Sequence, residues 1–230
     1  MKTVFTAAAV AALAGSAFAN IDRSLYTIYS DAAVTAVDIR QAGDDASRSF
    51  TGVSYSNLTS DVEGFFSQSL TTPDGDGAPT PLDFDDYQSI APGNAFLDEF
   101  GFVGGVDTVG GVVFFDIFDA GGAPVDGFGV ALASAGNFIY TIDITNNDVL
   151  VPAGGFVQMS VDDDGAFGPA TGASWFLTAD DATVGDNLGA GFTSPAGNDL
   201  NYAFELVTIP TPGAAGLLGL AGLAAIRRRR

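Results

Sequence analysis

Three clusters of acidic side chains offer the clearest chemistry in this sequence, which is the binding of a divalent cation. Ca²⁺ takes about six to eight oxygen ligands from carboxylates, carbonyls and water, and glycines let a loop wrap around the ion. An ordinary solvated acidic turn is the alternative interpretation of each cluster. Ca²⁺ is therefore the candidate cofactor, and its predicted ligands are Asp74, Asp76, Asp162, Asp163, Asp164, Asp180 and Asp181. Asp83, Asp85 and Asp86 follow the first cluster, and Asp186 and Asn187 complete the third.

The charge of the chain also favours cations over polyanions. Its 230 residues include 28 acidic and 8 basic side chains, a formal net charge of −20. All the acidic residues lie from Asp22 to Glu205, where only Arg23, Arg40 and Arg48 are basic, so this body carries 3 − 28 = −25. Nucleic acid is excluded as a partner because phosphate binding needs clustered Lys and Arg. Self-repulsion at this charge destabilises a compact fold, which is a second argument for bound cations.

Composition excludes several catalytic mechanisms. The sequence has no His and no Cys, and its only Lys is Lys2. It therefore cannot form a Ser-His-Asp triad, a thiol nucleophile, a conventional zinc site or a haem ligand pair. A P-loop lysine and a Schiff-base lysine are excluded as well. We predict that the body is not an enzyme.

Two carbohydrate-related functions remain as alternatives. A lectin-like module would stack aromatic rings on sugars, and Trp175, Tyr140 and Tyr87 are the candidate rings, although the apolar run around Trp175 favours a core position. A polysaccharide hydrolase would need two carboxyls about 5–10 Å apart. Glu99 and Glu205 are candidates for such a pair, but no sequence signature joins them.

The elements that would position these residues are predicted to be short β-strands. Alternation places Phe138, Tyr140, Ile142 and Ile144 on one face of a strand. The same alternation places Phe128, Val130 and Leu132 on one face of another strand. Strands at this spacing, separated by Gly- and Asp-rich turns, predict an all-β, antiparallel, jelly-roll-like β-sandwich. Residues 31–40 fit a first strand better than a short helix. The other expected strands are Ser49–Tyr55, Phe84–Ile90, Val112–Asp119, Gly127–Ala133, Phe138–Thr145, Phe156–Asp162, Ser174–Thr178 and Tyr202–Ile209.

The first 19 residues are typical of a secretory signal peptide. Lys2 supplies a positive start, and an apolar run follows from Val4 to Ala14. Ala17 and Ala19 form a small-x-small cleavage site, so the mature chain is expected to begin at Asn20. A buried or membrane-anchored first helix is the alternative.

The other end of the chain predicts a short membrane helix. Residues 213–226 read GAAGLLGLAGLAAI, and Arg227, Arg228, Arg229 and Arg230 follow directly. At about 1.5 Å per residue this run spans about 21 Å, less than a hydrocarbon core of about 30 Å. The arginines would remain on the cytoplasmic side. A core or amphipathic helix is the alternative, which the lack of a polar face disfavours.

The last two dozen residues resemble a PEP-CTERM sorting domain. The resemblance rests on Pro210, Thr211, Pro212 and Gly213, then the apolar run, then the four arginines, with Thr211 where the family has its name-giving Glu. It implies recognition by an exosortase, a membrane protease-transpeptidase, with cleavage near the prolines and delivery to the cell surface or beyond. Independently, two prolines favour an extended segment that a protease can reach.

The sequence thus predicts three parts: a signal peptide (1–19), an acidic β-sandwich (20–209) and a sorting signal (210–230). We expect an exported cell-surface or extracellular-matrix protein with a structural or adhesive role. Its expected partners are the export machinery, an exosortase-type protease, the membrane before processing, and surface polysaccharide.

Overall fold

A computed structural model of the chain describes most of the predicted body. The predicted signal cleavage residues Ala17, Ala19 and Asn20 lie outside the described residues, as does the sorting segment after Pro210. The described residues are 23–30, 33–38, 52–58, 66–70, 84–91, 93–144, 146, 148–162, 165–169, 171–178, 182–187, 192–193 and 199–210.

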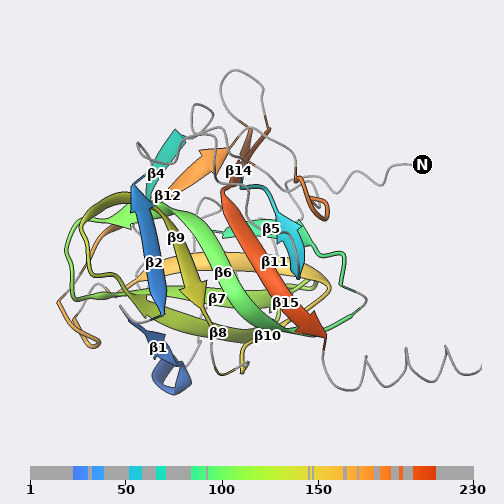
Figure 1. Cartoon of the computed structure of the whole chain (residues 1–230), viewed down its shortest axis with the longest axis horizontal. Helices are drawn as coiled ribbons and strands as arrows, with labels where there is room; N and C mark the ends of the chain where they lie inside the picture. The colour runs from blue at the N-terminus through green and yellow to red at the C-terminus, as the bar shows by residue number, and fades with distance from the viewer. Residues whose placement is uncertain are drawn as a thin grey trace, which may run out of the picture.

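Two β-sheets form the described body, which confirms the expectation of an all-β fold with two sheets (Figure 1). Among the described strands, every pair is antiparallel except β1 with β8. The smaller sheet has the order β1 (Ile28–Tyr29), β8 (Pro124–Ala131), β7 (Val112–Asp119), β11 (Gly154–Val161), β5 (Phe84–Gln88). The main path of the larger sheet is β13 (Phe192–Thr193), β14 (Asp199–Tyr202), β12 (Ala173–Thr178), β6 (Ala95–Val106), β15 (Phe204–Pro210), β3 (Val53–Ser56). It also includes β2 (Val34–Asp38), β4 (Phe66–Leu70), β9 (Gly136–Asp143) and β10 (Leu150–Val151), and a 3₁₀ turn η1 (Arg23–Leu25) precedes β1.

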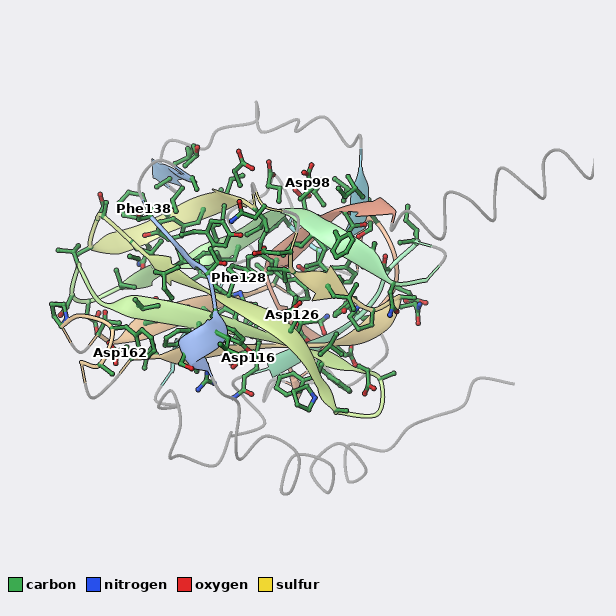
Figure 2. All side chains as sticks on the ribbon, turned by 90° about the horizontal axis from the view of Figure 1, so that it is seen from below. Asp98, Asp116, Asp126, Phe128, Phe138 and Asp162 are labelled. Carbon is green, nitrogen blue, oxygen red and sulfur yellow. The ribbon has the colours of Figure 1, made fainter. Side chains whose placement is uncertain are left out.

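The core lies between the sheets, on the faces that alternation predicted. Tyr140, Ile142 and Ile144 of the β9 region are buried, and Phe138 packs against them. Phe128, Val130 and Leu132 of the β8 region are buried in the same core. Figure 2 shows Phe128 between the sheets, with Asp98 on the side of the larger sheet and Asp116 on the side of the smaller one. The region 31–40 contains strand β2, as the strand interpretation expected, and β2 pairs with β9.

Strand β6 is the main element that the sequence did not predict. It is 12 residues long and pairs with β9, β15, β12 and β10. Its glycines weaken the usual strand pattern, but they are needed where neighbouring backbones approach. A Cβ on Gly105 would lie 2.1 Å from the carbonyl oxygen of Gly136, and one on Gly104 would lie 2.5 Å from that of Ser174.

Candidate functional site

Among the predicted calcium ligands, Asp162 is the one that the structure describes. Its carboxylate is fully buried and closes the turn that follows β11. Oδ1 accepts hydrogen bonds from the backbone N–H groups of Gly165 (3.1 Å) and Ala166 (3.2 Å), and Oδ2 accepts one from Phe167 (3.0 Å). Asp162 thus stabilises the loop. Asp74, Asp76, Asp163, Asp164, Asp180 and Asp181 lie outside the described residues.

The structure brings parts of the first and third acidic clusters to one end of the smaller sheet. Gln88 of β5 forms an isolated bridge with Asp186. The Tyr55 hydroxyl donates to Asn187 Oδ1 at 2.6 Å, and burial together with Asp85, Asp86 and Asp186 raises the pKa of Tyr55. Within the described part of the chain, however, no group of three or more His, Cys, Asp or Glu side chains could hold a metal ion.

Asp85 is a buried carboxylate in this region. Oδ1 accepts a hydrogen bond from the backbone N–H of the adjacent Asp86 (2.9 Å), and Oδ2 accepts one from Tyr202 (2.5 Å) that links β5 to β14. Burial, and then the nearby Asp86 carboxylate, raise the pKa of Asp85 well above its ordinary value of 3.8, and the two hydrogen bonds oppose this only in part.

This raised pKa predicts that Asp85 makes the fold less stable as the pH rises. The folded state binds the Asp85 proton more tightly than the unfolded state does, so its contribution to the free energy of unfolding is largest below pH 3.8 and falls as the pH rises toward the folded-state pKa. We expect Asp85→Asn to flatten this dependence. Urea midpoints of both proteins between about pH 4 and 8 would measure it. The exposed Asp98→Asn should retain the wild-type slope, and an unchanged slope in Asp85→Asn would contradict the prediction.

A buried ion pair lies on the outer face of the smaller sheet. Asp116 lies in the middle of β7 and is fully buried, and Arg23 of η1 is only 8 % exposed. Arg23 Nη2 lies 2.6 Å from Asp116 Oδ2, and Nε donates to Oδ1 at 3.3 Å. The Tyr26 hydroxyl also donates to Oδ1, at 2.9 Å. Burial raises the pKa of Asp116, and the Arg23 guanidinium opposes this shift.

Sequence reasoning missed this pair because its members are 93 positions apart. One signal was present, since Asp116 interrupts the apolar run Val-Val-Phe-Phe-Asp-Ile-Phe of a predicted strand. A carboxylate at such a position is expected to need a charged or hydrogen-bonding partner. Arg23 was recognisable only as one of the few basic residues of the body.

Two further polar side chains lie on the same face of the smaller sheet. Gln158 of β11 is the register partner of Asp116, and Ser160 is the partner of Phe114. Gln158 is 3 % exposed and Ser160 is fully buried, yet Gln158 Oε1 and Ser160 Oγ have no hydrogen-bond partner among the residues that the structure describes. Buried polar atoms of this kind are commonly satisfied by ordered water.

The larger sheet places the two candidate hydrolase carboxylates on one face. In the β6–β15 register Glu99 is opposite Val207, and Glu205 is opposite Gly101. Glu99 and Glu205 are therefore diagonal neighbours on the outer face, with Cα atoms roughly 7–8 Å apart by strand geometry. Glu205 is 3 % exposed and Glu99 is partly exposed. Asp143 extends this row from β9.

The candidate sugar-stacking rings are in the core, so the prediction that they contact a sugar is wrong. Trp175 and Tyr87 are fully buried and Tyr140 is 1 % exposed. The core position expected for Trp175 is confirmed by a ring stack on Tyr202, 4.4 Å between centroids, and a hydrogen bond from Nε1 to the Ala203 carbonyl at 3.1 Å.

The comparisons with known proteins do not assign the chain to a family. No family model, no curated protein and no solved structure matches the chain. Of the residues that the structure describes, none belongs to a helix with the length and apolar character of a membrane span.

Proposed function

We propose that the chain is an exported protein of the cell surface or extracellular matrix with a structural or adhesive role, sorted by its C-terminal segment. One observation carries this proposal. Strand β15 lies between β6 and β3 and ends at Pro210, the first residue of the proline-containing sorting motif. The packed sheet therefore reaches the first residue of the motif, since Pro210 is the register partner of Ala95. A jelly-roll-like topology and a transient C-terminal membrane helix are part of this proposal.

The proposal is tested by the mass of the native C-terminus. We expect protein from the host's surface to end near Pro210 to Pro212, because the proposed sorting signal implies cleavage beside these prolines. Deleting Arg227–Arg230 should abolish this processing, because the basic stop that holds the helix is lost. A mature protein that still carries all four arginines would show a permanent anchor and contradict sorting.

Bound Ca²⁺ remains part of the proposal, as a stabiliser of the acidic body. The candidate ligands other than Asp162 would have to supply the site. A ligand that binds only the folded state stabilises it by about 2.7 kcal/mol at a concentration 100-fold above its Kd. We therefore expect a higher melting midpoint in Ca²⁺ than in EGTA. Equal midpoints would exclude a folded-state calcium site, and Mg²⁺ at the same ionic strength controls for charge screening.

The row of Glu99, Glu205 and Asp143 favours a second candidate function, an interaction with polysaccharide, including its hydrolysis. The two glutamates project from the same face of the sheet as diagonal neighbours, and a glycosidase needs two carboxyls roughly 5–10 Å apart on one face. The burial of Glu205 limits access, so this function ranks second. Glu99→Gln and Glu205→Gln should each abolish release of reducing ends, whereas Asp98→Asn should not. The absence of release and of binding by the wild-type chain would exclude this candidate.

A further inference from the structure

Three apolar side chains form a row across three neighbouring strands at one end of the larger sheet. Phe96 of β6 is the register partner of Leu150 of β10 on one side and of Ile209 of β15 on the other. Register partners project from the same face of a sheet, with Cβ atoms about 4.5–5.5 Å apart. Ile209 is 37 % exposed, and Phe96 and Leu150 are partly exposed. We call these three residues the apolar row.

The apolar row belongs to the outer face of the larger sheet. Leu97 and Val151, which follow Phe96 and Leu150 along their strands, are buried in the core between the two sheets. Because successive side chains of a strand point to opposite faces, Phe96 and Leu150 point away from that core. A single exposed apolar residue is ordinary on a protein surface, but this row is contiguous over three strands. It is therefore a surface on which an apolar partner fits.

The chain leaves the sheet beside this row, toward the proposed membrane helix. Pro210, the last residue of β15, is the register partner of Ala95, the first residue of β6. Figure 1 shows the end of β15 close to β10 and to the start of β6. The apolar run begins at Gly213, and three residues span at most about 11 Å even when fully extended. An inserted helix would thus hold the row close to the headgroup layer, which is roughly 5–8 Å thick on each side.

The shortness of the apolar run draws the same end of the body toward the bilayer. Residues 213–226 span about 21 Å as a helix, about 9 Å less than the hydrocarbon core. A short span is accommodated by thinning of the bilayer and by flanking residues that extend into the interface. On the cytoplasmic side those residues are the four arginines. On the other side the flanking strand carries Ile209, whose neighbours in the row are apolar and enter the interface at low cost.

We propose that the apolar row lies against the headgroup layer of a zwitterionic bilayer while the C-terminal helix is attached, so that the larger sheet contacts the membrane at this end. The inference rests on the proposed function, because the helix must first insert. Anionic lipid is disfavoured because the body carries 3 − 28 = −25 and its charges would be repelled. Asp98, two residues along β6 from Phe96, is exposed and would face the headgroups. Processing beside the prolines would release this surface together with the body.

Quenching by labelled lipid tests the contact, because the chain has no Cys of its own. Full-length Leu150→Cys protein is labelled at its single thiol with an environment-sensitive fluorophore and reconstituted into phosphatidylcholine vesicles. Leu150 is the informative position, because β10 is joined to β15 through β6 and is not the strand that leads to the helix. Phosphatidylcholine with a nitroxide near its headgroup quenches fluorophores that reach the interface. We expect a blue-shifted emission and a loss of fluorescence when this lipid is included.

The same label at Val109 is the matched control. Val109 is 44 % exposed and follows the far end of β6, whose 12 residues at about 3.3 Å each separate it from the row. Its fluorescence should not change. Equal quenching at both positions, or none at position 150, in chains that float with the vesicles would overturn the inference and leave the membrane helix standing. Chains that do not float would overturn the helix and the inference with it. If labelled Leu150→Cys loses the wild-type circular dichroism spectrum, labelled Phe96→Cys replaces it, with the same expected loss of fluorescence.

Discussion

Replacing Arg23 by alanine is expected to lower the free energy of unfolding by about 3–5 kcal/mol, the cost of breaking a buried ion pair from one side. Asp116 would keep its position in the middle of β7 with no exposed surface, and it would lose both guanidinium contacts. Of the side-chain contacts described for Asp116, the hydrogen bond from the Tyr26 hydroxyl would then remain. A carboxylate without a compensating charge is costly in such an environment because water can no longer solvate it.

Matched variants separate the ion pair from the packing of residues 23–29 on the smaller sheet. Tyr26→Phe removes one hydrogen bond and should cost only about 1 kcal/mol. Arg23→Met with Asp116→Leu replaces both charges by apolar side chains and should recover most of the stability that Arg23→Ala loses. Urea unfolding followed by circular dichroism measures all four proteins. A loss below about 1 kcal/mol in Arg23→Ala would show that the pair contributes little, because an exposed ion pair contributes about 0–1 kcal/mol to the free energy of unfolding.

The sequence predicted the strand faces well because burial leaves a local pattern. Phe128, Val130 and Leu132 alternate with small or polar residues, and this alternation depends only on neighbours in the chain. Strand Val112–Asp119 was predicted with its observed bounds for the same reason. Strand β6 was missed because its glycines serve contacts with Gly136 and Ser174, which are distant in sequence. A local pattern carries no information about such contacts.

The candidate sites were harder to predict because they depend on strand register or on the conformation of a turn. Glu99 and Glu205 become diagonal neighbours only once β6 pairs with β15, and a shift of one residue would place Glu205 on the opposite face. Asp162 fitted a metal-ligand pattern, yet its oxygens accept three backbone hydrogen bonds in the turn. An acidic loop sequence does not distinguish these two uses of a carboxylate.

Trp175→Ala is expected to be the most damaging substitution within the core, with a loss of about 3–5 kcal/mol. The indole is fully buried and stacks on Tyr202, and its ring also lies 5.9 Å from Phe115, edge-on, and 5.8 Å from Phe204. Its N–H group satisfies the carbonyl of Ala203. Alanine would leave a cavity between the two sheets, because the surrounding rings belong to strands whose positions several neighbours fix.

The neighbouring Phe176 provides the matched control, because it points to the other face of β12. Phe176 is 9 % exposed and belongs to a small outer cluster with Val103 and Ala203, apart from the main core. We expect Phe176→Ala to cost clearly less than Trp175→Ala, since fewer packed neighbours surround it. Circular dichroism must follow the unfolding because the chain has only one Trp. Equal losses for the two substitutions would contradict this prediction, because the face of β12 toward the smaller sheet would then contribute no more to stability than the outer face. The packing of Trp175 against Phe115 of β7 predicts the opposite.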